Sequence, residues 1–238
     1  MYIKPHKNSI LIIDFGSQYN QLTARRVREN NVFCQIVPPD ISISDIERLQ
    51  PKGIILSGGP ASVYQANAPK CDSRIFNLGI PVLGICYGMQ FMAHTLNGEV
   101  ARAKKKEYGR AELAIDDRSD LFKGLPKRIV SWMSHGDHIS RLPQGFVKLT
   151  HTSNTKVASF ADRSRKFYGV QFHPEVAHTE FGSLILKNFL FNICKCPASW
   201  TMKSFIKESI CGIRNTVGNE KLVLGLQAGL IHRLRQCF

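Results

Sequence analysis

The first half of the chain alternates short apolar runs with amphipathic stretches. The apolar runs are typical of central parallel strands and cover 9–14, 32–37, 53–56 and 82–85. Between them, residues at helical spacing predict helices over 18–30, 44–49 and 71–78. In the first of these helices Leu22 and Val27 would face the sheet, and Ser44 would cap the second helix. This alternation predicts an α/β fold with a mostly parallel, open twisted sheet flanked by helices.

The pattern changes after a helix over 89–96. Strand-like segments then dominate, at 110–115, 128–132, 146–150, 156–160 and 166–171. They predict an antiparallel extension of the sheet or a small second sheet. An amphipathic helix over 181–193 would complete a domain spanning 1–195.

A linker with Pro197 follows that domain. A helix over 200–215 and an apolar strand over 221–226 come next. We therefore predict that 196–226 contains the linker, first helix and first strand of a second α/β domain.

Composition narrows the class of protein. Hydrophobic residues make up 43% of the chain, enough for a core, but no apolar run reaches the about 20 residues that cross a bilayer. The N-terminal stretch lacks a signal-peptide core. The 7 cysteines are scattered without a C-x-x-C pair, and Cys194 and Cys196 are too close together for a zinc site. We expect a soluble cytoplasmic protein with reduced thiols, no metal and no membrane partner.

The formal net charge of +14 raises the possibility of nucleic-acid binding. Most basic residues are spread along the chain, however, and the cluster of Lys104–Lys106 with Arg110 has no interleaved aromatic residues. We predict a solvated face, or a docking surface for an anionic partner domain, and no nucleic acid.

Cys86 is the candidate nucleophile. It follows the apolar strand 82–85 and lies between Gly84 and Gly88, in the thiol counterpart of the G-x-S-x-G nucleophile elbow. A helix starting at this point would direct free N–H groups at the sulfur and favour the thiolate. The alternative is a buried structural cysteine.

A thiolate nucleophile needs a base and a group that orients the base. His173 ends a strand, Pro174 fixes the backbone after it, and Glu175 can accept a hydrogen bond from the imidazole. The alternative is a structural histidine, and the nearby elbow argues against it.

Acyl transfer also needs donors for an oxyanion. The N–H of Tyr87 follows the nucleophile, and the loop with Gly58 and Gly59 ends a neighbouring strand. Gly59 is the predicted second donor, although two glycines alone would indicate only a flexible turn.

These motifs resemble the class I, or triad, glutamine amidotransferases over about 8–195. The resemblance rests on Gly-Ile-Cys-Tyr-Gly-Met-Gln at 84–90, Ser-Gly-Gly-Pro at 57–60 and Phe-His-Pro-Glu at 172–175. Three more motifs narrow it to the GMP synthase branch of that family: Asp-Phe-Gly-Ser-Gln-Tyr at 14–19, Ser-His-Gly-Asp at 134–137, and Trp200 with Phe205.

The resemblance implies a flavodoxin-like fold and a glutaminase site. Cys86 would form a glutamyl thioester, His173 would protonate the leaving ammonia and activate water, and Glu175 would orient His173. Gly59 and Tyr87 would hold the oxyanion. The implied glutamine-binding residues are Gly58, Gln90, Ser134, His135 and Asp137. No cofactor is implied for this domain.

In GMP synthases the next domain carries a Ser-Gly-Gly-Val-Asp-Ser-Ser loop for the ATP pyrophosphate. Here Leu224–Leu226 leads instead into Gln227–Phe238. Codons for that tail, read with one extra T before them, can encode the missing loop. We predict that 227–238 is a frame-shifted tail and that the sites for ATP and Mg belong to a missing synthetase domain.

Several functions stay open. The favoured one is the glutaminase half of GMP synthase, with a synthetase (ATP-pyrophosphatase) partner in cis or in trans. The alternatives are a non-catalytic docking or regulatory module, a cysteine hydrolase acting on γ-glutamyl compounds, another triad amidotransferase, and a stand-alone amidotransferase subunit.

Overall fold

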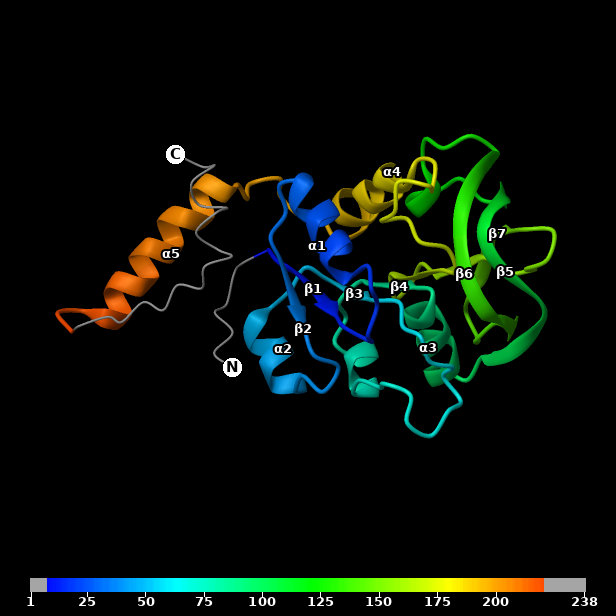
Figure 1. Ribbon diagram of the computed structural model, residues 1–238, viewed down its shortest axis with the longest axis horizontal. Helices are drawn as coiled ribbons and strands as arrows, with labels where there is room; N and C mark the ends of the chain where they lie inside the picture. Colours follow the sequence, from blue (N-terminus) through cyan, green and yellow to red (C-terminus); the bar gives the residue numbers. More distant parts are fainter. Residues whose placement is uncertain (1–7, 221–238) are drawn as a thin grey trace, which may run out of the picture. The chain divides into compact units, whose positions relative to one another are not determined.

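The computed structural model describes residues 8–220, and one mixed sheet forms its centre (Figure 1). The strand order in this nine-stranded sheet is β2-β1-β3-β4-β9-β8-β7-β5-β6. The strands are β1 (Ile10–Ile13), β2 (Cys34–Val37), β3 (Gly53–Leu56), β4 (Val82–Ile85), β5 (Glu99–Ile115), β6 (Arg128–Arg141), β7 (Val147–His151), β8 (Ser159–Asp162) and β9 (Phe167–Val170).

The strands from β2 to β9 in that order run parallel, and the remaining pairs are antiparallel. The predicted α/β fold with a mostly parallel sheet is confirmed. The antiparallel strands extend this sheet and do not form a second one. The segment 166–171, which we expected in the antiparallel part, contains β9, and β9 pairs in parallel with β4 through Gly84 and Gly169. That pairing brings the ends of β4 and β9 to the same edge.

Helices cover both faces of the parallel strands (Figure 1). One core cluster joins the sheet to α1 and the α4–η3 segment, and the other joins it to α2, η1 and α3. The bounds are α1 (Asn20–Glu29), α2 (Ile43–Leu49), η1 (Ser73–Asn77), α3 (Tyr87–Thr95), η2 (Asp120–Phe122), α4 (Gly182–Lys187), η3 (Asn188–Ile193) and α5 (Met202–Val217).

Some local predictions were wrong. Ser42, not Ser44, caps α2, because its side chain accepts the N–H of Asp45 and its backbone is extended. Leu22 is only half-buried, whereas Thr23, Ala24 and Val27 face the core. The helix expected over 71–78 is a short 3-10 helix, η1.

The hairpin of β5 and β6 is much longer than the sequence predicted. Residues 103–106 of β5 lie opposite the single residue Gly136, because Arg102 pairs with Asp137 and Glu107 pairs with His135. Such a bulge interrupts the alternation that marks a strand in the sequence.

The chain divides into compact units at Trp200. Trp200 belongs to the first unit, where its N–H donates to the Asn31 carbonyl and its ring packs against Phe33. In the second unit α5 begins with a capping box between Thr201 and Ser204. The predicted strand 221–226 and tail 227–238 lie outside the described residues.

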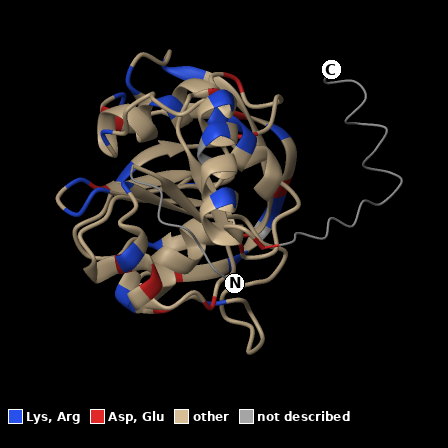
Figure 2. Ribbon diagram, turned by 90° about the vertical axis from the view of Figure 1, so that its left-hand side faces the viewer, with Lys and Arg blue, Asp and Glu red and all other residues tan. Residues whose placement is uncertain are grey.

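Lys and Arg occur on several helices, strands and loops and are not confined to one element (Figure 2). Over residues 8–220, every helix is too short or too polar to cross a membrane.

Candidate active site

Cys86 lies on a sharp turn between β4 and α3, with φ 51° and ψ −105°. A Cβ at Gly84 would lie 2.6 Å from the Gly88 carbonyl carbon, and a Cβ at Gly88 would collide with the Leu56 carbonyl. The Cys86 N–H donates to the Val170 carbonyl at 2.8 Å, which ties the turn to β9. Both glycines are therefore needed for the close approach of strand and helix that holds Cys86 in this strained conformation.

His173 and Glu175 follow β9 and form a buried pair. His173 Nδ1 lies 2.8 Å from Glu175 Oε1, and both side chains are at most 5% exposed. The His173 N–H donates to the Trp132 carbonyl of β6, and Thr179 Oγ1 donates to the His173 carbonyl. Because Nδ1 bonds to Glu175, Nε2 is the ring nitrogen left to face Cys86.

The surroundings of His173 favour its protonated form. Burial lowers the pKa of His173, but its hydrogen bonds to Cys86 and Glu175 and the charges of both groups outweigh burial and raise the pKa to about 10. An imidazolium beside the sulfur is the arrangement that stabilises a thiolate.

The buried cysteines elsewhere differ in this respect. Burial raises the pKa of Cys34 to about 11 and that of Cys71 to about 12. These thiols stay protonated at neutral pH and are poor nucleophiles.

Two backbone N–H groups lie close to the sulfur. Tyr87 is the first residue of α3, so its N–H has no acceptor within the helix. The loop after β3 is held against α3 because the Gly88 N–H donates to the Ser57 carbonyl at 3.0 Å. Gly59 is required in this loop, since a Cβ there would lie 2.6 Å from the Phe15 carbonyl oxygen.

A cavity of about 490 Å³ opens beside Cys86. The predicted site residues that line it are Gly59, Cys86, Tyr87, Gln90, Ser134, His135 and Asp137. Gly58 lies instead against His173, with its Cβ position 3.2 Å from His173 Cε1.

A smaller cavity of about 270 Å³ lies on the other side of Cys86. It is lined by His173, by Ser134 and by residues 16–19 of the motif that follows β1. The Tyr19 ring packs edge-on against the His173 ring at 5.1 Å between centroids.

Sequence reasoning missed several residues of this region. Gln171 Nε2 lies 3.6 Å from Cys86 Sγ, and Tyr64 donates its hydroxyl hydrogen to Asp137 Oδ1 at 2.9 Å. Glu107, Arg102 and Lys106 also lie in or next to the larger cavity. Only Gln171 carried a sequence signal, since it precedes the Phe-His-Pro-Glu motif.

Within the described part of the chain, no group of three or more His, Cys, Asp or Glu side chains could hold a metal ion.

Residues 11–193 match the sequence profile of the family described as glutamine amidotransferase class-I. A glutamine-hydrolysing GMP synthase of Prochlorococcus marinus (strain AS9601) is 56% identical over 228 residues, which cover 95% of this chain and 43% of that protein. The corresponding protein of Caldanaerobacter subterraneus subsp. tengcongensis is 53% identical over 94% of this chain and 44% of its own length. The chain thus spans less than half the length of these curated relatives.

Solved structures give the same family. A Thermoplasma acidophilum protein described as one subunit of a GMP synthase has a TM-score of 0.71 and 31% identity, over 87% of this chain and 100% of its own. A Thermotoga maritima glutamine amidotransferase has a TM-score of 0.63 over 86% of each chain, and its 21% identity supports the fold alone.

Proposed function

Because the chain belongs to the class-I glutamine amidotransferase family, we propose that it hydrolyses the side-chain amide of glutamine with Cys86 as nucleophile. The chain is homologous to the glutaminase half of GMP synthases. The single observation that carries the proposal is the position of Cys86, on the elbow between a buried His173–Glu175 pair and a cavity of about 490 Å³.

In the first half of the reaction, glutamine occupies the larger cavity and Cys86 Sγ attacks its amide carbon. The N–H groups of Gly59 and Tyr87 stabilise the negative charge that develops on the amide oxygen. The His173 imidazolium gives its proton to the amide nitrogen as the C–N bond breaks, so ammonia leaves and a γ-glutamyl thioester remains on Cys86.

In the second half, water attacks the thioester. His173, now neutral, takes a proton from that water, and glutamate leaves as the Cys86 thiolate forms again. The cavity of about 270 Å³, which His173 lines, gives water a path to the thioester from the side opposite the substrate.

The ammonia would serve a synthetase. By analogy with relatives named GMP synthase, it would replace an oxygen of xanthosine monophosphate in an ATP-dependent step on a synthetase domain, supplied in cis or in trans. The sites for ATP and Mg²⁺ would lie on that synthetase and not on the described residues.

Selective alkylation tests this proposal. The glutamine-like diazo ketone 6-diazo-5-oxonorleucine should modify Cys86 stoichiometrically, because among the described thiols this one combines an imidazolium neighbour with an adjoining cavity. Peptide mapping by mass spectrometry locates the modified residue.

Cys71→Ala is the matched control, since Cys71 is a buried cysteine with a raised pKa. Labelling should persist in that variant and vanish in Cys86→Ala. Labelling that survives Cys86→Ala, or that never occurs, would refute the catalytic role and favour a docking module instead.

A further inference from the structure

A chain of buried polar groups leads away from the nucleophile. Gln171 Nε2 lies 3.6 Å from Cys86 Sγ, and Gln90 Nε2 donates both to Gln171 Oε1 and to the Asp137 carbonyl, each at 3.1 Å. That carbonyl also lies 2.8 Å from His135 Nδ1. The position of Gln90 thus depends on an acceptor that His135 helps to hold.

The chain ends at Glu107, a carboxylate whose side chain is only 5% exposed. Glu107 accepts hydrogen bonds from Thr152 Oγ1 at 2.7 Å, from Thr155 Oγ1 at 2.6 Å and from Asn154 Nδ2 at 3.3 Å, and Glu107 Oε2 lies 3.2 Å from His135 Nε2. Burial raises the pKa of Glu107, but these donors outweigh burial and lower the pKa to about 2. Glu107 is therefore ionised at any physiological pH.

His135 lies between two acceptors. One is the Glu107 carboxylate and the other is the Asp137 carbonyl, and neither can donate a hydrogen. A neutral imidazole has one N–H, so it would leave one of these contacts unmade. His135 is 4% exposed, and a repulsive contact between two acceptors there would be costly. Both contacts are satisfied only when both ring nitrogens carry a proton.

We propose that Glu107 holds His135 as a buried imidazolium and thereby fixes the Asp137 carbonyl and Gln90 in the wall of the larger cavity. Glu107 touches no reacting atom, so it is a positioning residue and not a catalytic one. That the cavity takes glutamine rests on the proposed function, whereas the ion pair does not.

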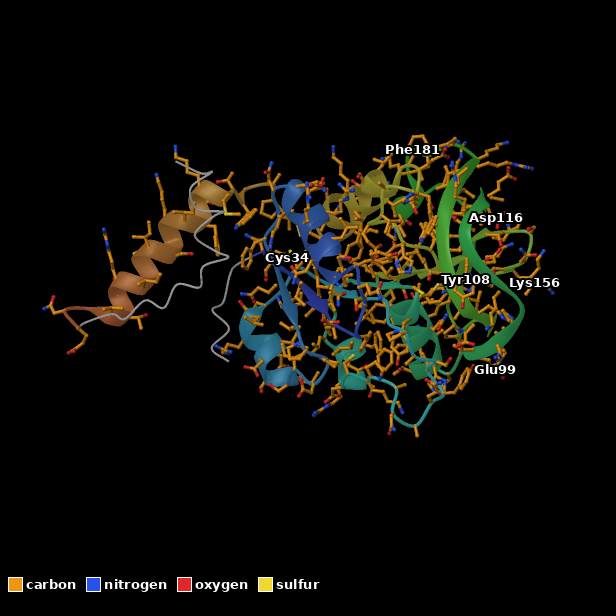
Figure 3. All side chains as sticks on the ribbon, viewed as in Figure 1. Cys34, Glu99, Tyr108, Asp116, Lys156 and Phe181 are labelled. Carbon is orange, nitrogen blue, oxygen red and sulfur yellow. The ribbon has the colours of Figure 1, made fainter. Side chains whose placement is uncertain are left out.

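The strand explains why this role is hidden in the sequence. Tyr108 follows Glu107 on β5 and is 66% exposed, while Glu107 points to the opposite, buried side (Figure 3). Residues 103–106 bulge out opposite Gly136, and this shift sets Glu107 opposite His135. Without the bulge the carboxylate would point to the other face.

Nitrogen NMR on the protein with ¹⁵N-labelled histidine tests the ion pair directly. At neutral pH both ring nitrogens of His135 should be protonated, and the His135→Gln variant assigns the signals. In Glu107→Gln the amide can donate to Nε2, so His135 should change to a neutral ring with the proton on Nδ1. A neutral His135 in the unaltered protein, or a doubly protonated one in Glu107→Gln, would overturn the proposal.

Kinetics test the positioning role. Glu107→Ala should raise KM for glutamine about tenfold and leave kcat within about twofold, because it loosens the cavity wall without touching the Cys86–His173–Glu175 set. Glu107→Gln should recover part of that loss. The matched control is Glu112→Ala, which removes an exposed ion pair with Arg128 on the same strand and should change neither constant.

An unchanged KM in folded Glu107→Ala would overturn the positioning role. If that variant does not fold, the NMR comparison of the unaltered protein with Glu107→Gln decides the ion pair. If the protein does not turn over glutamine, the proposed function fails, and the NMR result still stands or falls alone.

Discussion

At the scale of single residues, Glu175 and Gly59 carry the most direct consequences. Glu175 supplies a hydrogen bond and a negative charge to His173, and both raise the pKa of that imidazole. Gly59 supplies an N–H from a loop that has no room for a side chain. Each residue permits a substitution that changes one property of the site while the fold stays intact.

We predict that Glu175→Gln moves the alkaline limit of activity to lower pH. Acylation needs protonated His173, so activity in the unaltered protein should fall as pH rises through about 10. Without the carboxylate the pKa of His173 falls, so the loss begins at lower pH, and kcat at neutral pH should drop about 100-fold. The pH profile of kcat/KM checks this, with the exposed Glu112→Gln as control. An unshifted limb would show that Glu175 does not set the protonation of His173.

We predict that Gly59→Ala lowers kcat about 100-fold and changes KM much less. The added Cβ would lie 2.6 Å from the Phe15 carbonyl oxygen, so the loop must move and withdraw its N–H from the developing oxyanion. Steady-state glutamine hydrolysis measures the split, and circular dichroism shows that the fold survives. A kcat within twofold of the unaltered protein would remove Gly59 from the oxyanion hole.

At the scale of elements, the sequence predicted the parallel strands well and the β5–β6 hairpin poorly. Strands such as β1 and β3 are buried on both faces, so they appear as uninterrupted apolar runs. The hairpin lies at the edge of the sheet, alternates buried with exposed residues and contains a bulge, so no single period marks it. For the same reason the Cys86, His173 and Glu175 motifs could be found from the sequence, whereas Glu107 could not.

The cap of α2 gives a test at this scale. Ser42 accepts the N–H of Asp45 at 3.1 Å, whereas Ser44 lies within the first turn. Ser42→Ala should lower the free energy of unfolding by about 1 kcal/mol, and Ser44→Ala should lower it by clearly less. Urea denaturation compares them. Equal losses in the two variants would mean that the two serines share the cap.

At the scale of the whole molecule, the site belongs to one unit. The residues of the Cys86 site, both core clusters and Trp200 lie in the unit that ends at Trp200. We therefore predict that a fragment ending at Trp200 folds and keeps its Cys86 reactivity. Its Tm should stay within about 4 °C of the full chain, equivalent to less than about 1 kcal/mol. A fragment that unfolds or loses labelling at Cys86 would show that the two units depend on each other.

The central claim is that Cys86 forms a covalent bond with the amide carbon of glutamine. The most direct measurement is to quench the protein with acid during turnover and examine its peptides by mass spectrometry. The account predicts a γ-glutamyl thioester on the peptide that contains Cys86, glutamate and ammonia in equal amounts, and neither adduct nor products in Cys86→Ala. Glutamine hydrolysis that continues in Cys86→Ala would contradict the account.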